Sequence, residues 1–233
     1  MAFEYLDLPF FPKGFLKSEM DRLLAPPLKN REIKDPFSAL IEGYSSGGYD
    51  SWVERETARA LNKSLTNRLG AFHQEVIGAL PGWKSTGPHG DAYDVIHEGP
   101  FGPRNRPAVA EVKAKYNTMN SNGAERVYNN FLSLRKHSKF KEYDCYLIQM
   151  IQKHPVNEPW VPNQKSYGKL DHIRVIGAPE VFAISIGDPN AFSEFMRAFE
   201  QYLIEFYNCE PDKKLGDVIS QAFPTVNLNP EAN

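Results

Sequence analysis

Three residues near the middle of the chain, Asp94, Glu111 and Lys113, have types and spacing that could carry chemistry. An apolar segment predicts a strand over residues 108–113, and strand alternation turns Glu111 and Lys113 to one face. Asp94 lies on a preceding predicted strand, and the Gly/Pro-rich link between the two strands permits antiparallel pairing. Mg²⁺ accepts one or two carboxylates together with waters and phosphate oxygens. The pattern therefore predicts a site that hydrolyses a phosphate ester, in which Lys113 orients or helps to deprotonate the attacking water.

A second copy of the Glu-x-Lys spacing and an ordinary ion pair are the alternatives to this interpretation. Glu32 and Lys34 have the same spacing, but an Asp-Pro pair follows them and no apolar strand supports them, so we interpret them as solvated surface. A lone Glu-x-Lys on a strand is usually an exposed ion pair worth ~0–1 kcal/mol. For Glu111 and Lys113, a metal site and a surface ion pair therefore both stay open.

The segment from residue 104 to 141 concentrates positive charge around these residues. It contains nine Lys and Arg against two acids, a net charge of +7 within a chain of net charge −2. Neutralising nucleic-acid phosphates needs such a cluster, although a solvated helix face is the alternative for residues 135–141. The loop at 116–123 (YNTMNSNG) is rich in Asn, which suits adenine edges and phosphates but also plain turns. The candidates for DNA contacts are Lys115, Asn117, Asn120 and Arg126.

The elements that must position these side chains alternate between helices and strands. Apolar residues at steps of three or four from Leu61 to Leu80 predict a long helix over 51–80, with Ser51 as its N-cap and Glu54 as the capping-box partner. The other predicted helices cover residues 17–24, 123–137 and 190–207, and the predicted strands cover residues 91–97, 108–113, 143–151, 172–176 and 181–186. This order predicts an α/β fold with a central mixed β-sheet flanked by helices on both sides.

The chain length and the distribution of these elements predict a single domain over residues 1–233. We expect an irregular N-terminal segment at 1–50, with a flexible loop at 44–49, a catalytic core at 51–207 and a C-terminal extension at 208–233.

The composition is that of an ordinary globular protein, with 41% hydrophobic and 24% charged residues. The two cysteines, Cys145 and Cys209, have no metal-ligand spacing, which disfavours a structural zinc site and indicates a reducing compartment. No basic-then-apolar leader and no apolar run of membrane-spanning length occurs, so we expect a cytoplasmic protein.

His73 is interpreted as a packed or capping histidine. The histidines form no HxxxH pattern and the chain has no GxxxxGK[ST] loop, which disfavours a zinc hydrolase and an ATP-driven enzyme.

Several segments resemble restriction endonucleases of the PD-(D/E)XK superfamily. Asp94, the turn-rich link and the Glu-Val-Lys at 111–113 match the superfamily pattern, and the string EVKAKYNTMN that begins at Glu111 resembles one group within it, which cuts GGNCC or GGWCC sites. KSLTNRLGAFHQEVIGALPGW (63–83), YDV (93–95) and, more weakly, HIRVIG followed by IGDPNAF match in the same order. Together these segments cover residues 60–195.

The resemblance implies a restriction-endonuclease-like fold and a type II restriction endonuclease, which hydrolyses double-stranded DNA at a short, palindromic sequence with Mg²⁺. It assigns metal binding to Asp94 and Glu111, with the backbone carbonyl of Val112 as a further ligand, and the catalytic lysine role to Lys113. Glu75, near the end of the long helix, is a candidate for an extra acidic ligand, although a solvated helix carboxylate is an alternative of at least equal weight.

One departure from the superfamily pattern concerns the first metal ligand. Tyr93 stands where the motif has proline. That proline is commonly absent from the superfamily, and its absence here leaves Asp91 as a competitor of Asp94 for the metal. A palindromic site is most simply cut by a symmetric dimer with one active site per strand, so we expect a homodimer. The resemblance also implies a cognate DNA methyltransferase in the host. The alternatives are a repair or junction-resolving nuclease of the same superfamily and a DNA-binding protein without catalysis.

Overall fold

The computed structural model describes residues 4–26, 36–87, 92–162 and 167–224. Its centre is a six-stranded mixed sheet with the strand order β1-β2-β3-β4-β6-β5. The bounds are Trp83–Ser85 for β1, Val95–Phe101 for β2, Arg106–Lys115 for β3, Asp144–Ile151 for β4, Glu158–Pro159 for β5 and Ile173–Gly177 for β6. The strands β3, β4 and β6 are parallel, and the other pairs are antiparallel.

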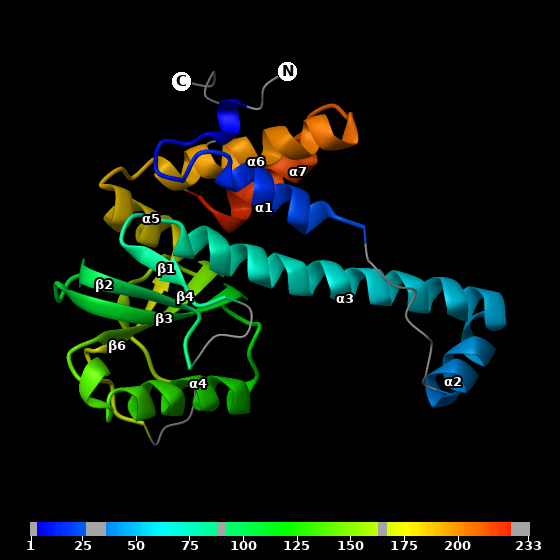
Figure 1. The fold of residues 1–233 in the computed structure, drawn as a ribbon. Helices are drawn as coiled ribbons and strands as arrows, with labels where there is room; N and C mark the ends of the chain where they lie inside the picture. Colours follow the sequence, from blue (N-terminus) through cyan, green and yellow to red (C-terminus); the bar gives the residue numbers. More distant parts are fainter. Residues whose placement is uncertain (1–3, 27–35, 88–91, 163–166, 225–233) are drawn as a thin grey trace.

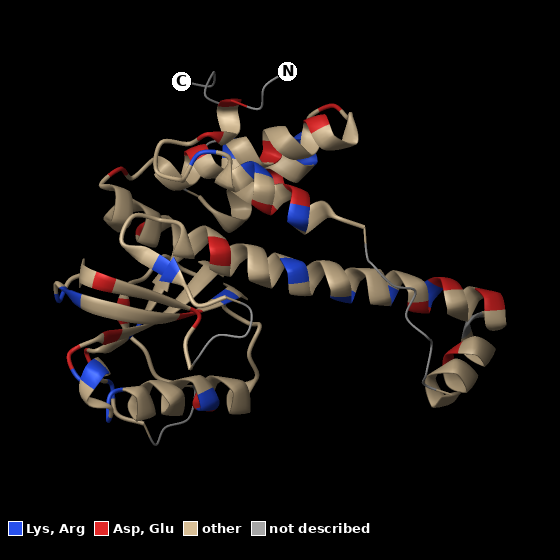
Figure 2. Ribbon diagram, viewed as in Figure 1, with Lys and Arg blue, Asp and Glu red and all other residues tan. Residues whose placement is uncertain are grey.

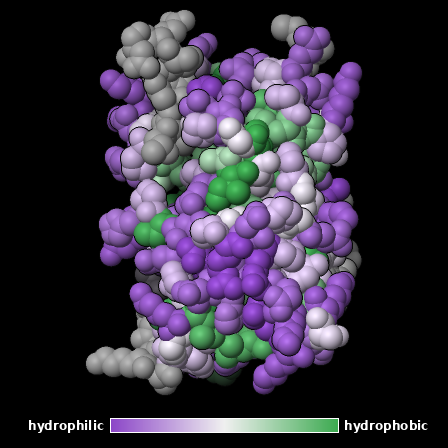
Figure 3. All heavy atoms as spheres, turned by 90° about the vertical axis from the view of Figure 1, so that its left-hand side faces the viewer, coloured by the Kyte–Doolittle hydropathy of each residue, from purple (hydrophilic) through white to green (hydrophobic). Residues whose placement is uncertain are grey.

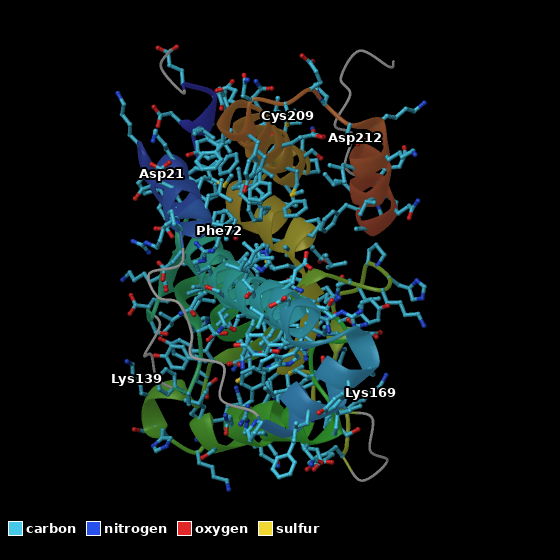
Figure 4. The ribbon with its side chains drawn as sticks, turned by 90° about the vertical axis from the view of Figure 1, so that its right-hand side faces the viewer. Asp21, Phe72, Lys139, Lys169, Cys209 and Asp212 are labelled. Atoms are coloured by element: carbon cyan, nitrogen blue, oxygen red, sulfur yellow. The ribbon has the colours of Figure 1, made fainter. Side chains whose placement is uncertain are left out.

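Helices cover both faces of this sheet (Figure 1). The helix α4 lies on one face, whereas α3 and α5 lie on the other face with α1, α6 and α7 beyond them. Figure 4 shows the same layers along the axis of α3, with Asp21 and Asp212 on one side of that helix and Lys139 on the other. The bounds are Phe15–Leu24 for α1, Pro36–Ser46 for α2, Tyr49–Gly78 for α3, Ser121–Leu134 for α4, Ala178–Ile186 for α5, Ala191–Tyr207 for α6 and Lys213–Ala222 for α7, with short 3₁₀ turns at Glu4–Leu6 and Ser138–Phe140.

Strand alternation divides the core into two clusters, one on each face of the sheet. In β3, Ala108 and Ala110 belong to the cluster under α3 and α5, whereas Val109 belongs to the cluster under α4. The central strand β4 is buried from Asp144 to Ile148, as expected for a parallel strand covered on both faces. The predicted α/β fold, a mixed sheet flanked by helices on both sides, is confirmed.

One predicted strand is wrong. Residues 181–186 belong to the helix α5, which begins directly after β6 with Pro179 in its first turn. Val181 and Phe182 are fully buried on the sheet, so their helix carries an apolar run that resembles a buried strand. A short apolar run does not distinguish these two environments, and the proline after Gly177 favours the start of a helix.

The N-terminal part is more regular than the sequence indicated. A second helix, α2, covers Pro36–Ser46, so residues 44–49 do not form the predicted loop. Two glycines with φ of 98° and 112°, Gly47 and Gly48, make the turn into α3, because other residues adopt such angles at a cost. The helix α3 begins at Tyr49, and the predicted N-cap at Ser51 is therefore wrong. The predicted C-terminal extension contains α7, and the one-domain organisation stays a prediction.

The helix α3 is much longer than the sheet is wide. Its 30 residues correspond to ~45 Å. The C-terminal part packs on the sheet through Phe72, Val76 and Ile77, whereas the N-terminal part extends past the sheet and carries α2 at its far end (Figure 1). Among the described residues, no helix combines the length and the apolar character needed to cross a membrane.

Candidate active site

The side chain of Asp94 is held by the backbone of β3. Asp94 lies directly before β2 and not within it, so the predicted strand over 91–97 begins too early, and the Asp94 N–H donates to the Ala110 carbonyl of β3 at 2.9 Å. Beyond this point β3 continues without β2, and the next N–H at the same edge, that of Val112, donates to Asp94 Oδ2 at 2.7 Å. The carboxylate thus replaces a missing strand partner, which fixes its position against β3.

Glu111 and Lys113 form the second part of the site. The Lys113 ammonium donates to Glu111 Oε1 at 2.5 Å, and the two side chains retain 27% and 21% of their exposure, respectively. They are therefore half-enclosed and remain open to a ligand. The strand alternation predicted from the sequence is confirmed, because the intervening Val112 packs in the core on the other face.

The electrostatics of Asp94 reflect two neighbouring carboxylates. Burial raises the pKa of Asp94 and the negative charge of Glu111 raises it further, whereas the Val112 N–H and Lys113 lower it. A cation placed beside the two carboxylates would offset both the burial and the repulsion and favour the charged form of Asp94. The charged form of Asp94 is thus disfavoured unless a further cation neutralises it, as expected of a metal ligand.

Two residues that the sequence reasoning missed hold the backbone of Asp94 in place. The Asp94 carbonyl accepts from Gln74 Nε2 at 3.1 Å and from the N–H and hydroxyl of Thr86, each at 2.9 Å. Gln74 also donates to the Gly87 carbonyl at 3.1 Å and so ties α3 to the segment after β1. The motif analysis named only the neighbouring Glu75 as a functional residue of α3, and no local pattern identifies a glutamine that acts across 20 residues.

The remaining predicted ligands have different surroundings. Glu75 accepts a hydrogen bond from the Ser85 hydroxyl at 2.8 Å, and among the described ranges no three His, Cys, Asp or Glu residues form a metal-binding group. The role of Glu75 as a further metal ligand stays a prediction. The Val112 carbonyl points to the same edge of β3 as the Val112 N–H, where Asp94 lies, because both groups of a strand residue face one side. Asp91, Glu32 and Lys34 lie outside the described residues.

The four predicted DNA-contacting residues follow the site along the chain. Lys115 ends β3, Asn117 lies in the turn after it, and Arg126 lies on α4; all three are exposed. Asn120 is the N-cap of α4, and its Oδ1 accepts from Gly123 N–H at 2.8 Å. Reading adenine in the bidentate manner would require this same oxygen, so base reading by Asn120 competes with the cap.

The expectation that the whole basic segment surrounds the site is wrong. β3 and α4 run in opposite directions, so residues 104–106 and 135–141 lie at the far end of the sheet from Lys113 (Figure 2). Arg104 there forms an ion pair with the buried Asp144 at 3.1 Å, and Arg106 pairs with Glu142. Much of the far charge therefore has protein partners, and only the cations between residues 113 and 126 stay near the carboxylates.

The comparison with known proteins agrees with this geometry. The model of the Eco47II restriction endonuclease family matches residues 28–206. This chain belongs to the Eco47II restriction endonuclease family. The type II restriction enzyme Eco47II of Escherichia coli is 30% identical over 200 residues, which cover 78% of this chain and 81% of that protein. The type II restriction enzyme Sau96I of Staphylococcus aureus is 23% identical over 170 residues, which cover 69% of this chain and 62%, less than two thirds, of that protein.

Membership of the Eco47II family decides between the functional alternatives that the sequence left open. The protein is a type II restriction endonuclease, a site-specific deoxyribonuclease that acts on double-stranded DNA. Enzymes of this class generally need a divalent metal. This family membership disfavours the two alternatives, a repair or junction-resolving nuclease and a non-catalytic DNA-binding protein.

Proposed function

We propose that this enzyme uses Mg²⁺, held by Asp94 and Glu111, to hydrolyse both strands of DNA at a short palindromic sequence of the GGNCC or GGWCC type. Lys113 is the catalytic lysine. The enzyme acts as a homodimer in the cytoplasm of a host whose cognate methyltransferase protects the same sequence.

A single observation carries the assignment of the site. The Asp94 carboxylate is fixed by the Val112 N–H at 2.7 Å, directly beside the pair formed by Glu111 and Lys113. The residue that precedes β2 and two residues of β3 thus bring two carboxylates and one ammonium together. The exposed ion pair that the sequence left as an alternative requires no such partner from outside β3.

The donor set fits Mg²⁺. This ion takes oxygen ligands in an octahedral arrangement and usually keeps several waters, so two carboxylates and the Val112 carbonyl suffice together with a phosphate oxygen. The burial of Asp94 and the repulsion from Glu111, which together raise the pKa of Asp94, support the same assignment, since a divalent cation offsets both effects. The chemistry that the metal supplies when bound is charge neutralisation at the phosphate and a lower pKa for the attacking water.

The residues of the chain have separate tasks in this scheme. Asp94 and Glu111 bind the metal, and the hydrogen bond from Val112 keeps Asp94 in place during the reaction. Lys113 orients the attacking water and places positive charge beside the phosphate, where negative charge increases in the transition state. Lys115 and Arg126 neutralise the flanking phosphates, and Asn117 and Asn120 are the candidates for base contacts.

The test is plasmid digestion with and without Mg²⁺, followed by sequencing of the fragment ends. We expect Mg²⁺-dependent ends at one palindromic sequence for the wild type and none for Glu111→Gln or Lys113→Ala. A matched control exists on the same sheet, because Lys84 and Glu98 form an exposed ion pair at 3.0 Å between β1 and β2. Lys84→Ala and Glu98→Gln should cleave like the wild type.

The possible failures of this test separate the parts of the proposal. Near-normal turnover by Glu111→Gln would contradict the metal site. Fragment ends at an unrelated sequence would contradict only the recognition site. Equal loss of activity in the Lys84 and Glu98 controls would show that the effect comes from the stability of the sheet rather than from chemistry.

A further inference from the structure

The outer face of α2 is an apolar stripe on the surface of the protein. Leu40, Ile41 and Tyr44 have exposed fractions of 57%, 71% and 88%, and Phe37 on the same face has 76%. The spacing of these four residues, with steps of three and four, places them on one side of the helix. The opposite side of α2 packs on α3, where Gly43 is buried against Trp52. The inner face thus holds the helix in place and leaves the apolar face outward.

We propose that this stripe is the contact surface for a second copy of the same chain, so that two copies pair through the arm formed by residues 36–65. The arm extends past the end of the sheet at which β3 ends and the Asp94 carboxylate lies (Figure 1). Pairing through the arms therefore joins two copies on the side that carries their active sites. The inference rests on the proposed function, in which one active site cuts each strand.

The charge of α2 excludes the other obvious occupant, which is DNA. The described helix contains no Lys or Arg, and its only acid, Glu42, is paired with Arg59 Nη1 at 2.9 Å on the inner side. Binding to phosphates needs cations, and an aromatic and aliphatic stripe supplies none. Interfaces between protein chains, in contrast, are depleted of charge at their centre and enriched in aromatic residues.

The exposed area of the stripe is large enough to form the centre of a dimer interface. If a fully exposed side chain of this size offers ~150–200 Å², the four stripe residues together present roughly 500 Å² per copy. A standard interface takes ~800 Å² from each partner, so the stripe supplies more than half of it. Tyr49, directly after the turn that joins α2 to α3, is a further exposed apolar residue of the arm. The side of the molecule away from the arm is largely hydrophilic, with hydrophobic areas near its centre and its lower end (Figure 3).

The experiment is sedimentation velocity of the full-length protein over a range of concentrations. The test variant is Ile41→Glu/Tyr44→Glu, and the matched control is Leu215→Glu/Val218→Glu, which introduces the same charges at exposed apolar positions of α7. We expect a dimer for the wild type and the control, and a dissociation constant raised at least ~100-fold for the test variant. Circular dichroism should show unchanged helix content, because the substituted side chains are exposed. If the double variant loses helix, Tyr44→Gln replaces it in the same measurement.

Three results would overturn the inference. These are a monomeric wild type at every concentration, a test variant that dimerises like the wild type, and a control variant that dissociates in its place, which would move the interface to α7. Cleavage assays keep this inference apart from the proposed active site. The monomeric test variant should retain Mg²⁺-dependent nicking of single strands at high enzyme concentration but lose coordinated double-strand cleavage. Glu111→Gln should stay dimeric without cleaving DNA, so the dimer interface and the active site are tested independently.

Discussion

The hydrogen bond between Asp94 and the Val112 N–H allows the structural and the chemical role of this aspartate to be separated. Asp94→Asn keeps an oxygen that accepts from Val112 and removes the negative charge. Asp94→Ala removes both and leaves the Val112 N–H without its 2.7 Å partner at a partly buried edge. Comparison of the two variants therefore isolates the hydrogen bond from the carboxylate.

The stability change follows from this difference. An unsatisfied, partly buried N–H costs ~1–3 kcal/mol. For a protein of this length, each kcal/mol shifts Tm by ~2–4 °C, so Asp94→Ala should melt ~2–12 °C lower than the wild type in EDTA. Asp94→Asn loses a charge-assisted bond but also loses the repulsion from Glu111 that raises the pKa of Asp94. These two effects oppose each other, and we expect its stability to lie within ~1 kcal/mol of the wild type.

The activity of the two variants should fall together. Both lack the metal-binding carboxylate, and loss of ~4 kcal/mol of transition-state stabilisation corresponds to a ~10³-fold lower cleavage rate. Thermal melting in EDTA and single-turnover plasmid cleavage in Mg²⁺ measure the two quantities separately. If Asp94→Asn melts as low as Asp94→Ala, the hydrogen bond does not hold the strand edge. If Asp94→Asn cleaves within tenfold of the wild type, Asp94 does not bind the metal.

Three further predictions concern residues around the site. Gln74→Ala should lower kcat ~10–100-fold with unchanged DNA affinity, because Gln74 positions Asp94 through the Asp94 carbonyl. An equal loss of kcat in the exposed-glutamine control Gln201→Ala would contradict this role. Asn120→Ala should lose ~1 kcal/mol of unfolding free energy because the N-cap of α4 is lost, whereas Asn120→Asp should keep the wild-type stability. Equal denaturant midpoints for the two variants would exclude a capping role. Burial lowers the pKa of His73 to about 4, so the free energy gained by keeping it neutral is complete above pH 6.5 and is lost as the pH falls toward 4. Relative to His73→Gln, the wild type should lose about 2 kcal/mol between pH 7 and pH 5 in urea unfolding, and parallel pH profiles would refute this.

Some properties of this protein are determined by the sequence alone because they are local. Alternation along a strand places Glu111 and Lys113 on one face wherever the strand lies, and the structure confirms this. The apolar periodicity up to Leu80 likewise produces the C-terminal part of α3 without reference to other elements. The motif around Glu111 is long enough to indicate the family, and the family match confirms it.

Only the tertiary structure decided which neighbours these local elements meet. The bond between Asp94 and Val112 joins residues 18 positions apart, and it exists because β2 and β3 pair in one register out of several that the sequence allowed. The same folding separates the basic segment into two ends of the sheet, since a strand followed by an antiparallel helix returns the chain to its start. Net charge along the sequence contains no information on that reversal.

The long-range environment also decided the cases in which local patterns were ambiguous. Residues 181–186 are apolar enough for a buried strand, yet β6 already has neighbours on both sides and the proline at 179 begins a helix. The apolar spacing of α2 was present in the sequence, but local periodicity does not reveal whether an apolar face meets a core or solvent. Burial is a property of the assembled layers, and it is the packing of α2 on α3 that leaves Ile41 and Tyr44 on the surface.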